Sequence, residues 1–402
     1  MTKWENALRE WIRSHALALG YAAVVLLGLF LRYSFMPLLS ADFKFFNIPW
    51  LDAVRTGGMR AVLNPELQYN YSALYLYLMG LLARLPLDSH TVLKGLCIAM
   101  EMLTSLAAFQ LIRSSTASRV HRFAGFSVVW LNPVLLLNAA GWGQMDTSFA
   151  LLCLLAVWLL SREKPVWALA AMGAALAWKL QAILLLPLFV LYWFCGKKRF
   201  SLLSFLLVPG VWVLSGVPMA LLGESPLFAV KTYLGQAAQY PQATFNYPNL
   251  FAIMGEAANQ KQMVVGMFSR TGIVLAIAAL GGMAVWMLQR RVCLEGSRTI
   301  LLTGAWCVLC CAFFLPRMHE RYAIVGELLL LAWAAGLGKP RGFLCLLASM
   351  LATLSAYAEY LFKQPFFPLQ LGGVINLCVL LFLTWEMVTT LRSQASEKEE
   401  IV

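Results

Sequence analysis

Between residues 146 and 199 the chain reads DTSFALLCLLAVWLLSREKPVWALAAMGAALAWKLQAILLLPLFVLYWFCGKKR. Three apolar runs lie here, at 146–160, 166–178 and 181–195, and they are separated or bounded by short polar and basic turns. A helix needs about 20 apolar residues to cross a bilayer, and shorter helices are tolerated inside a bundle. The stretch therefore predicts closely spaced membrane helices rather than a soluble core.

Apolar runs of this kind recur along the whole chain. Of its 402 residues 61% are hydrophobic and 12% are charged, and the mean hydropathy is +0.73. Soluble domains are about 25% charged, so water is not the solvent for most of this chain. We expect an all-α fold, a polytopic transmembrane helix bundle forming one domain over residues 1–402. The predicted spans are 16–35, 91–112, 123–140, 146–160, 166–178, 181–195, 201–222, 263–288, 299–315, 322–337, 342–360 and 369–391.

The net charge of +12 comes from Lys and Arg in short clusters between the apolar runs. This spacing indicates membrane topology and argues against a nucleic-acid partner. The positive-inside rule places the clusters, both termini and the tail 392–402 in the cytoplasm. The N-terminus lacks a cleavage site, so the first run is predicted to be a retained span. The clusters are the N-terminus, 113–122, 162–164, 197–199, 290–298, 339–341 and Arg392.

One further apolar stretch is YSALYLYLMGLLARLPL at 71–87. If it crossed the membrane, the orientation of every later segment would be reversed. It is short, rich in Tyr and ended by Pro86, so we predict a re-entrant or interfacial helix. The stretch 47–58 has the pattern of an amphipathic interfacial helix. Two short runs meet at Lys179, which predicts a cavity that reaches into the bilayer from outside.

The remaining segments fall on the non-cytoplasmic face, and almost every unusual polar residue lies in them. Outer loops are predicted at 36–90 and 223–262, and the shorter outer segments are 141–146, the turn at Lys179, 316–321 and 361–368.

Three acids in or near these segments are candidates for chemistry. Asp42 follows the first span and is flanked by aromatic residues, so it is either a solvated loop acid or a partly desolvated general base. Asp146, next to Gln144 in GWGQMD, either caps the following helix or holds a sugar or the acceptor. Glu101 lies within a span, where an acid has either a structural basic partner or a direct role.

Basic residues gather at the outer ends of two spans. Lys179 is one, and the run PRMHERY supplies Arg317, His319 and Arg321, with Glu320 placed to orient His319. Snorkelling to headgroups explains an isolated Arg at a helix end. Three potential cations within five residues on the outer face instead indicate a phosphate ligand, which guanidinium groups bind in bidentate fashion.

The loop 223–262 mixes aromatic and amide side chains, among them Tyr247 and Asn249. Such mixtures bind sugars, although aromatic residues at an interface are also ordinary belt residues. The two interpretations are equally supported by the sequence.

Together these features resemble the GT-C superfamily of membrane glycosyltransferases, which take sugars from polyprenyl-phosphate carriers. Its recurring catalytic feature is an acid in the first outer loop, the place of Asp42. Glu101, the basic loop 113–122, Leu131-Asn132-Pro133 and Gly143-Gln144-Met145-Asp146 are similar to the GPI mannosyltransferase pattern. The segment Met318-His319-Glu320-Arg321 is similar to the His-Glu-Lys motif of the lipid-phosphate-glucose-dependent glucosyltransferases.

The resemblance implies an inverting transfer of a hexose from a polyprenyl-phosphate donor to an acceptor hydroxyl on a glycan or lipid. Asp42 would be the base, and the basic residues would stabilise the leaving phosphate. Many relatives carry two acids in the first loop, whereas here Asp52 lies ten residues after Asp42. We therefore predict no metal and no cofactor. The expected partners are the donor, the acceptor and membrane lipid, and the expected location is a bacterial plasma membrane with the site on its outer face.

Two other classes fit about a dozen spans. A transporter or flippase commonly shows internal repeats and charges near the midplane, and neither pattern stands out here. A polysaccharide polymerase or ligase uses similar carriers and basic outer loops, and the sequence does not separate it from a single-sugar transferase.

Overall fold

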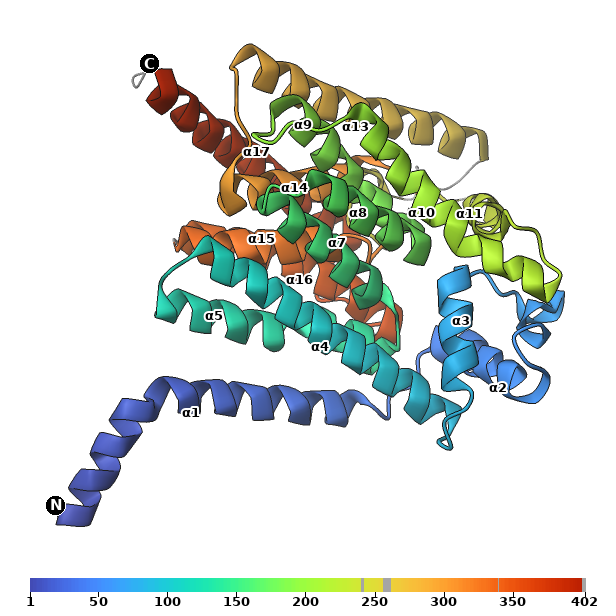
Figure 1. Ribbon diagram of the computed structural model, residues 1–402, viewed down its shortest axis with the longest axis horizontal. Helices are drawn as coiled ribbons and strands as arrows, with labels where there is room; N and C mark the ends of the chain where they lie inside the picture. The colour runs from blue at the N-terminus through green and yellow to red at the C-terminus, as the bar shows by residue number, and fades with distance from the viewer. Residues whose placement is uncertain (240–241, 256–261, 339, 400–402) are drawn as a thin grey trace.

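The computed structural model describes residues 1–239, 242–255, 262–338 and 340–399, and most of them are helical (Figure 1). The helices are α1 (Lys3–Phe35), α2 (Ile48–Gly57), α3 (Ala73–Leu82), α4 (Ser89–Ser115), α5 (Arg119–Trp130), α6 (Pro133–Leu136), α7 (Asp146–Ser161), α8 (Pro165–Trp178), α9 (Leu186–Cys195), α10 (Leu207–Gly216), α11 (Phe228–Gln239), α12 (Leu250–Ile253), α13 (Gln262–Gln289), α14 (Gly296–Phe314), α15 (Ile324–Leu337), α16 (Pro340–Phe362) and α17 (Leu369–Glu399). Two short parallel strands, β1 (Thr244–Phe245) and β2 (Met318–His319), pair beside them.

The predicted all-α polytopic bundle is confirmed. Within the described residues eight helical segments are long and apolar enough to span a membrane, and every predicted apolar run coincides with a helical segment. Four of those runs are the shorter apolar helices α7, α8, Leu180–Cys195 and α15. Most residues of α7 and α15 are buried, and both helices contribute to the main core, as expected of helices that are apolar on most sides.

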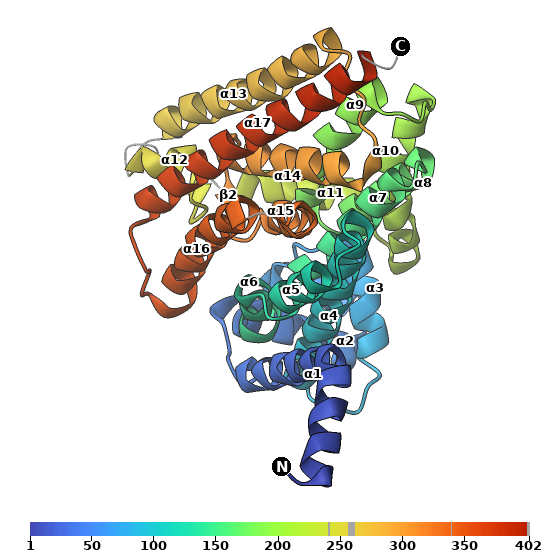
Figure 2. The same ribbon diagram turned by 90° about the vertical axis from the view of Figure 1, so that its left-hand side faces the viewer.

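Figures 1 and 2 show α1 and α13 at opposite margins of the bundle, with α14 and α15 between them. A buried ion pair attaches α1 to the rest. The Arg32 guanidinium contacts the Glu101 carboxylate of α4 at 2.6 Å from Nε and 2.8 Å from Nη2, and Ser105 also donates to Glu101. Both charged side chains are at most 2% exposed. Of the two roles expected for Glu101, the structure shows the structural pairing.

Helices α2 and α3 form a small unit with its own core against the start of α4, at the right of Figure 1. Trp50 of α2 lies in this core and donates from Nε1 to the Leu67 carbonyl at 2.7 Å. The ten residues of α3 are about 15 Å long at about 1.5 Å per residue, half the thickness of a bilayer core of about 30 Å. The segment 71–87 therefore does not cross a membrane as one helix, although its placement at an interface stays a prediction.

Three of the loops that carry basic clusters, 162–164, 197–199 and 290–298, lie together. Lys197 forms an ion pair with Glu163 at 3.1 Å, and the Leu294 amide donates to the Cys195 carbonyl. The loops predicted on the opposite face also meet, at the site described below. These contacts agree with the predicted grouping of those three basic loops, while the side of the membrane that each group of loops faces stays a prediction.

Candidate active site

Asp42 lies seven residues after the end of α1, at the start of a π-helical turn over Phe43–Asn47. Its Oδ2 accepts hydrogen bonds from Trp142 Nε1 at 3.2 Å and Gln144 Nε2 at 3.1 Å, and its Oδ1 accepts from the Tyr360 hydroxyl at 2.8 Å. The side chain is partly buried. Asp42 is therefore held in place by three donors and is not a solvated loop acid.

Local packing explains why Asp42 meets these donors. Ser40 donates from Oγ to the Trp142 carbonyl at 2.8 Å and joins the loop after α1 to the turn at 137–142. That turn ends at Gly143, which has φ 82°, and a Cβ there would lie 2.3 Å from the Phe43 ring. A glycine is required because the backbone is left-handed and the ring next to Asp42 packs directly on it.

The turn itself is a widened stretch of helix. Asn132 caps α6 by accepting from the amides of Val134 and Leu135, so the Leu131-Asn132-Pro133 motif begins a helix. After α6 the chain forms a π-helical turn over Leu137–Trp142. Lys94 of α4, fully buried, donates to the carbonyls of Ala140 and Gly141, both at 2.6 Å. These bonds satisfy carbonyls at the end of the helix and fix the residues that follow.

Asp146, fully buried, lies at the centre of a charged cluster. Lys179 Nζ contacts its Oδ1 at 2.5 Å, Arg321 Nε lies 3.3 Å from its Oδ2, and Asn138 Nδ2 donates to Oδ2 at 3.0 Å. A buried carboxylate needs such partners because desolvation is costly. Asp146 is the first residue of α7, whose N-cap is Met145, so the expected capping role is wrong.

Arg321 connects this cluster with Asp42. Its Nη1 contacts Glu320 Oε1 at 2.6 Å, and its guanidinium lies 5.0 Å from the centre of the Trp142 ring, the same ring that donates to Asp42. Within the described residues its Nη2 makes no hydrogen bond. Burial raises the pKa of Glu320, and the adjacent guanidinium opposes that shift. Arg321 is therefore anchored by two acids while one nitrogen remains for a ligand.

A cavity of about 650 Å³ opens beside these residues and is hereafter called the main cavity. Among its described lining residues Asp42 is the one acid and Arg321 the one cation. Its volume falls in the range of about 300–1,000 Å³ typical of ligand sites. Tyr71 and Gln144 belong to its wall and are joined by a hydrogen bond of 3.0 Å. The full lining is Asp42, Phe46, Asn47, Trp50, Pro65, Gln68, Tyr69, Asn70, Tyr71, Gln144 and Arg321.

Three other residues of the PRMHER segment are placed differently from the expectation. His319 is on β2 and stacks on Phe245 of β1, with ring centres 4.8 Å apart. Burial lowers the pKa of His319 to about 2, so the imidazole is neutral at neutral pH and does not supply the expected cation. Glu320 pairs with Arg321, while Arg317 is exposed, with its backbone amide bonded to the Ala243 carbonyl.

Two residues expected to bind sugar have structural surroundings instead. Tyr247 is 1% exposed and belongs to the main hydrophobic core. Asn249 is fully buried, and its side-chain oxygen caps α12 by accepting from the amides of Phe251 and Ala252. Neither is among the described residues of the main cavity wall. Part of the predicted loop 223–262 lies outside the described residues.

Three contributors to the site were not singled out from the sequence. Trp142 was visible in the GWGQMD motif but not assigned a role. Tyr360 is near the end of α16 and looks like an ordinary interface aromatic. Asn138 donates to both Asp146 and the Tyr357 hydroxyl from within an apolar run, where it gave no signal. Among the residues described, no group of three or more His, Cys, Asp or Glu is placed to hold a metal.

Comparison with known families gives a match to Glycosyltransferase family 87 over residues 69–316, more than half of the chain. The matched region contains Gln144, Asp146 and Lys179, and it ends just before the loop that carries Arg321. No curated protein matches the chain.

Proposed function

The chain belongs to glycosyltransferase family 87, and from this premise we propose that it moves a hexose from a polyprenyl-phosphate donor to an acceptor hydroxyl, with inversion. The observation that carries the proposal is that Asp42 and Arg321 border one cavity. A carboxylate able to take a proton and a guanidinium able to bind phosphate thus face the same space.

Asp42 is proposed as the general base. A carboxylate has about four lone-pair sites, and the donors from Trp142, Gln144 and Tyr360 occupy three of them. The remaining site is available to the acceptor hydroxyl in the main cavity. A positioned base of this kind contributes about 10²- to 10⁴-fold to the rate.

Arg321 is proposed to receive the leaving phosphate, with Lys179 beside it. The donor phosphate gains negative charge as the bond to the anomeric carbon breaks, so cations stabilise the transition state more than the ground state. Both cations contact Asp146, which keeps them in place before the donor arrives. A second small cavity, of about 50 Å³, is lined by both and lies next to Tyr71 of the main cavity wall.

Inversion is supported by the number of acids that face the cavity. A retaining mechanism uses a second carboxylate as nucleophile, as in glycosidases with paired acids. Asp146 is fully buried and is not among the described residues of the main cavity wall, so Asp42 is the acid that faces the substrate there. A single displacement assisted by Asp42 therefore fits the described wall of the cavity.

The lipid carrier and the outer face of a bacterial plasma membrane remain parts of the proposal. A polyprenyl tail can stay among membrane helices while its phosphate reaches Arg321 at the end of the bundle. Membership of a glycosyltransferase family favours transfer over transport as the activity. A polymerase or ligase differs in its product, and product length separates it from a single-sugar transferase.

The test is incubation of the purified protein with a panel of polyprenyl-phosphate hexoses and simple glycoside acceptors. We expect release of polyprenyl phosphate with one donor, and a product of the opposite anomeric configuration by NMR. Transfer from nucleotide sugars but from none of the lipid-linked donors would contradict the donor class. A product with the donor's configuration would contradict inversion.

A further inference from the structure

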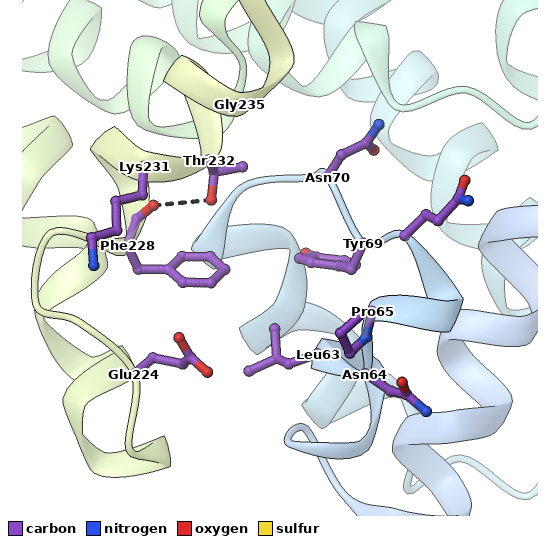
Figure 3. Close-up of a pocket in the computed structure, with 11 residues that line it drawn as sticks. Leu63, Asn64, Pro65, Tyr69, Asn70, Glu224, Phe228, Lys231, Thr232 and Gly235 are labelled. Atoms are coloured by element: carbon purple, nitrogen blue, oxygen red, sulfur yellow. Dashed lines mark hydrogen bonds between the residues drawn. The ribbon is translucent and has the colours of Figure 1, made fainter. Parts of the chain in front are cut away.

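A third cavity of about 270 Å³, hereafter the side cavity, lies between the segment 63–70 and α11 (Figure 3). Four residues belong to the walls of both the side cavity and the main cavity, so the two are adjacent and share one partition. These shared residues are Pro65, Gln68, Tyr69 and Asn70. The wall of the side cavity is completed by Leu63, Asn64, Glu224, Phe228, Lys231, Thr232 and Gly235.

The lining of the side cavity suits a neutral, hydroxyl-rich ligand. In Figure 3 the side chains of Tyr69 and Phe228 point toward each other across the cavity, and the Glu224 carboxylate is directed toward the space beside them. The Tyr69 hydroxyl donates to the Ser72 carbonyl at 2.8 Å, so this residue presents its ring rather than its hydroxyl. The wall combines these rings with amide, hydroxyl and carboxylate side chains, and a carboxylate accepts from hydroxyl donors.

Charge argues against a phosphate in the side cavity. In Figure 3 the Lys231 side chain is turned away from the space that Glu224 faces. The cations proposed for the donor phosphate, Arg321 and Lys179, are not among the described residues of this wall. The phosphate end of the donor therefore belongs on the Arg321 side of the main cavity, and the side cavity is left to the acceptor.

We propose that the side cavity binds the second sugar of the acceptor, so that the natural acceptor is a glycan of at least two sugars. This inference rests on the proposed function and adds the acceptor class to it. The sugar that carries the reacting hydroxyl lies beside Asp42 in the main cavity, and the sugar next to it lies on the other side of Tyr69, in the side cavity.

Gly235 provides a way to fill the side cavity. It lies within α11, a Cβ there meets nothing within 4 Å, and its backbone is not left-handed. Gly235→Trp is expected to occupy the side cavity without displacing backbone, and Gly235→Ala is the matched control. Glu224→Gln removes the charge that faces the cavity while keeping the size of the side chain.

The measurement is kcat/KM for methyl glycosides of one and of two hexoses, with the donor fixed. In the wild type we expect the disaccharide to be the better acceptor. Gly235→Trp should lower the ratio of kcat/KM for the disaccharide to kcat/KM for the monosaccharide about tenfold, which corresponds to the loss of roughly one or two hydrogen bonds. Glu224→Gln should lower this ratio less. Gly235→Ala should keep the ratio. An unchanged ratio in Gly235→Trp, or a wild type that prefers the monosaccharide, would overturn the inference and leave the proposed function standing.

Binding gives a readout that does not depend on turnover. Saturation-transfer NMR with the methyl disaccharide should show contact of both rings with the wild-type protein and loss of contact for the second ring in Gly235→Trp. Contact of both rings in the variant would overturn the inference. A wild type that binds the disaccharide in this manner but transfers to no acceptor would contradict the proposed function alone.

Discussion

The hydroxyl of Tyr360 donates to Oδ1 of Asp42 at 2.8 Å, although 318 residues separate the two in the chain. The stacked rings of Tyr360 and Trp142, 4.4 Å apart, bring a second donor to the same carboxylate. The site therefore exists only when α16 has packed against the turn at 137–142.

Removing the Tyr360 donor should slow transfer without unfolding the protein. Tyr360→Phe keeps the stacked ring but loses a hydrogen bond to a charged group, worth about 1.5–3 kcal/mol. We expect kcat to fall about tenfold or more while the donor Kd stays near the wild-type value. Tyr77→Phe is the matched control, because that hydroxyl donates to the Ser215 carbonyl and not to the site. Equal effects of the two changes would argue against a role for Tyr360 in holding Asp42.

The two arginines of the PRMHER segment should differ. Arg321→Lys keeps the charge but loses the planar fork, and we expect kcat/KM for the donor to fall about 10²-fold. Arg317 was predicted as a phosphate ligand too, but its exposed position leads us to expect a small effect from Arg317→Lys. Steady-state kinetics with varied donor measure both. A larger loss in Arg317→Lys would move the phosphate site to the other end of the segment.

The burial of His319 predicts a pH dependence of stability. Its pKa is lowered to about 2 in the folded protein, whereas an unfolded chain has a histidine pKa of about 6.5. Below about pH 6.5 the unfolded chain binds a proton that the folded protein excludes, so stability present above that pH is lost on acidification.

Between about pH 6 and 5, the free energy of unfolding should therefore fall less steeply with decreasing pH in His319→Gln than in the wild type. The difference in slope corresponds to about one proton, or about 1.4 kcal/mol per pH unit. Chemical denaturation of the purified protein at several pH values measures this slope. His15→Gln, an exposed change on α1, is the control. The same slope in wild type and His319→Gln would mean that the imidazole is not held neutral.

Membrane sidedness can be read from two exposed positions. Gln364 follows α16 in the group of loops that forms the site, and Lys198 lies in a basic loop of the other group. An impermeant maleimide should label Gln364→Cys on intact cells and Lys198→Cys only after permeabilisation, relative to the parent with its native cysteines. Labelling of Lys198→Cys from outside would place the site in the cytoplasm.

The helices could be predicted from the sequence because they depend on local signals. Apolar runs and basic clusters are visible one segment at a time, and so are the acids and cations that the sequence proposes for the site. Asp146 forms ion pairs with Lys179, 33 positions later in the chain, and with Arg321, 175 positions later. Such long-range pairs form only when the helices pack together, so the sequence alone does not reveal them.

Burial accounts for most of the remaining differences. His319 has the residue type of a cation, but its neutral state follows from its place on β2, which the sequence does not show. The residue type and loop position of Asn249 suit a sugar ligand, yet its side chain caps a short helix. Tyr360 resembled a belt residue, since only the packing of α16 reveals its contact with Asp42.

The proposed base is tested most directly by measuring sugar transfer in Asp42→Asn beside Asp52→Asn, with donor binding measured on the same samples. Asn keeps the size of the side chain but cannot take the hydroxyl proton, so transfer by Asp42→Asn should fall by about 10² or more while donor Kd is retained. Asp52 lies on α2, where it accepts from Ser89, and Asp52→Asn should transfer at close to the wild-type rate. Near wild-type transfer by a folded Asp42→Asn protein would contradict the account.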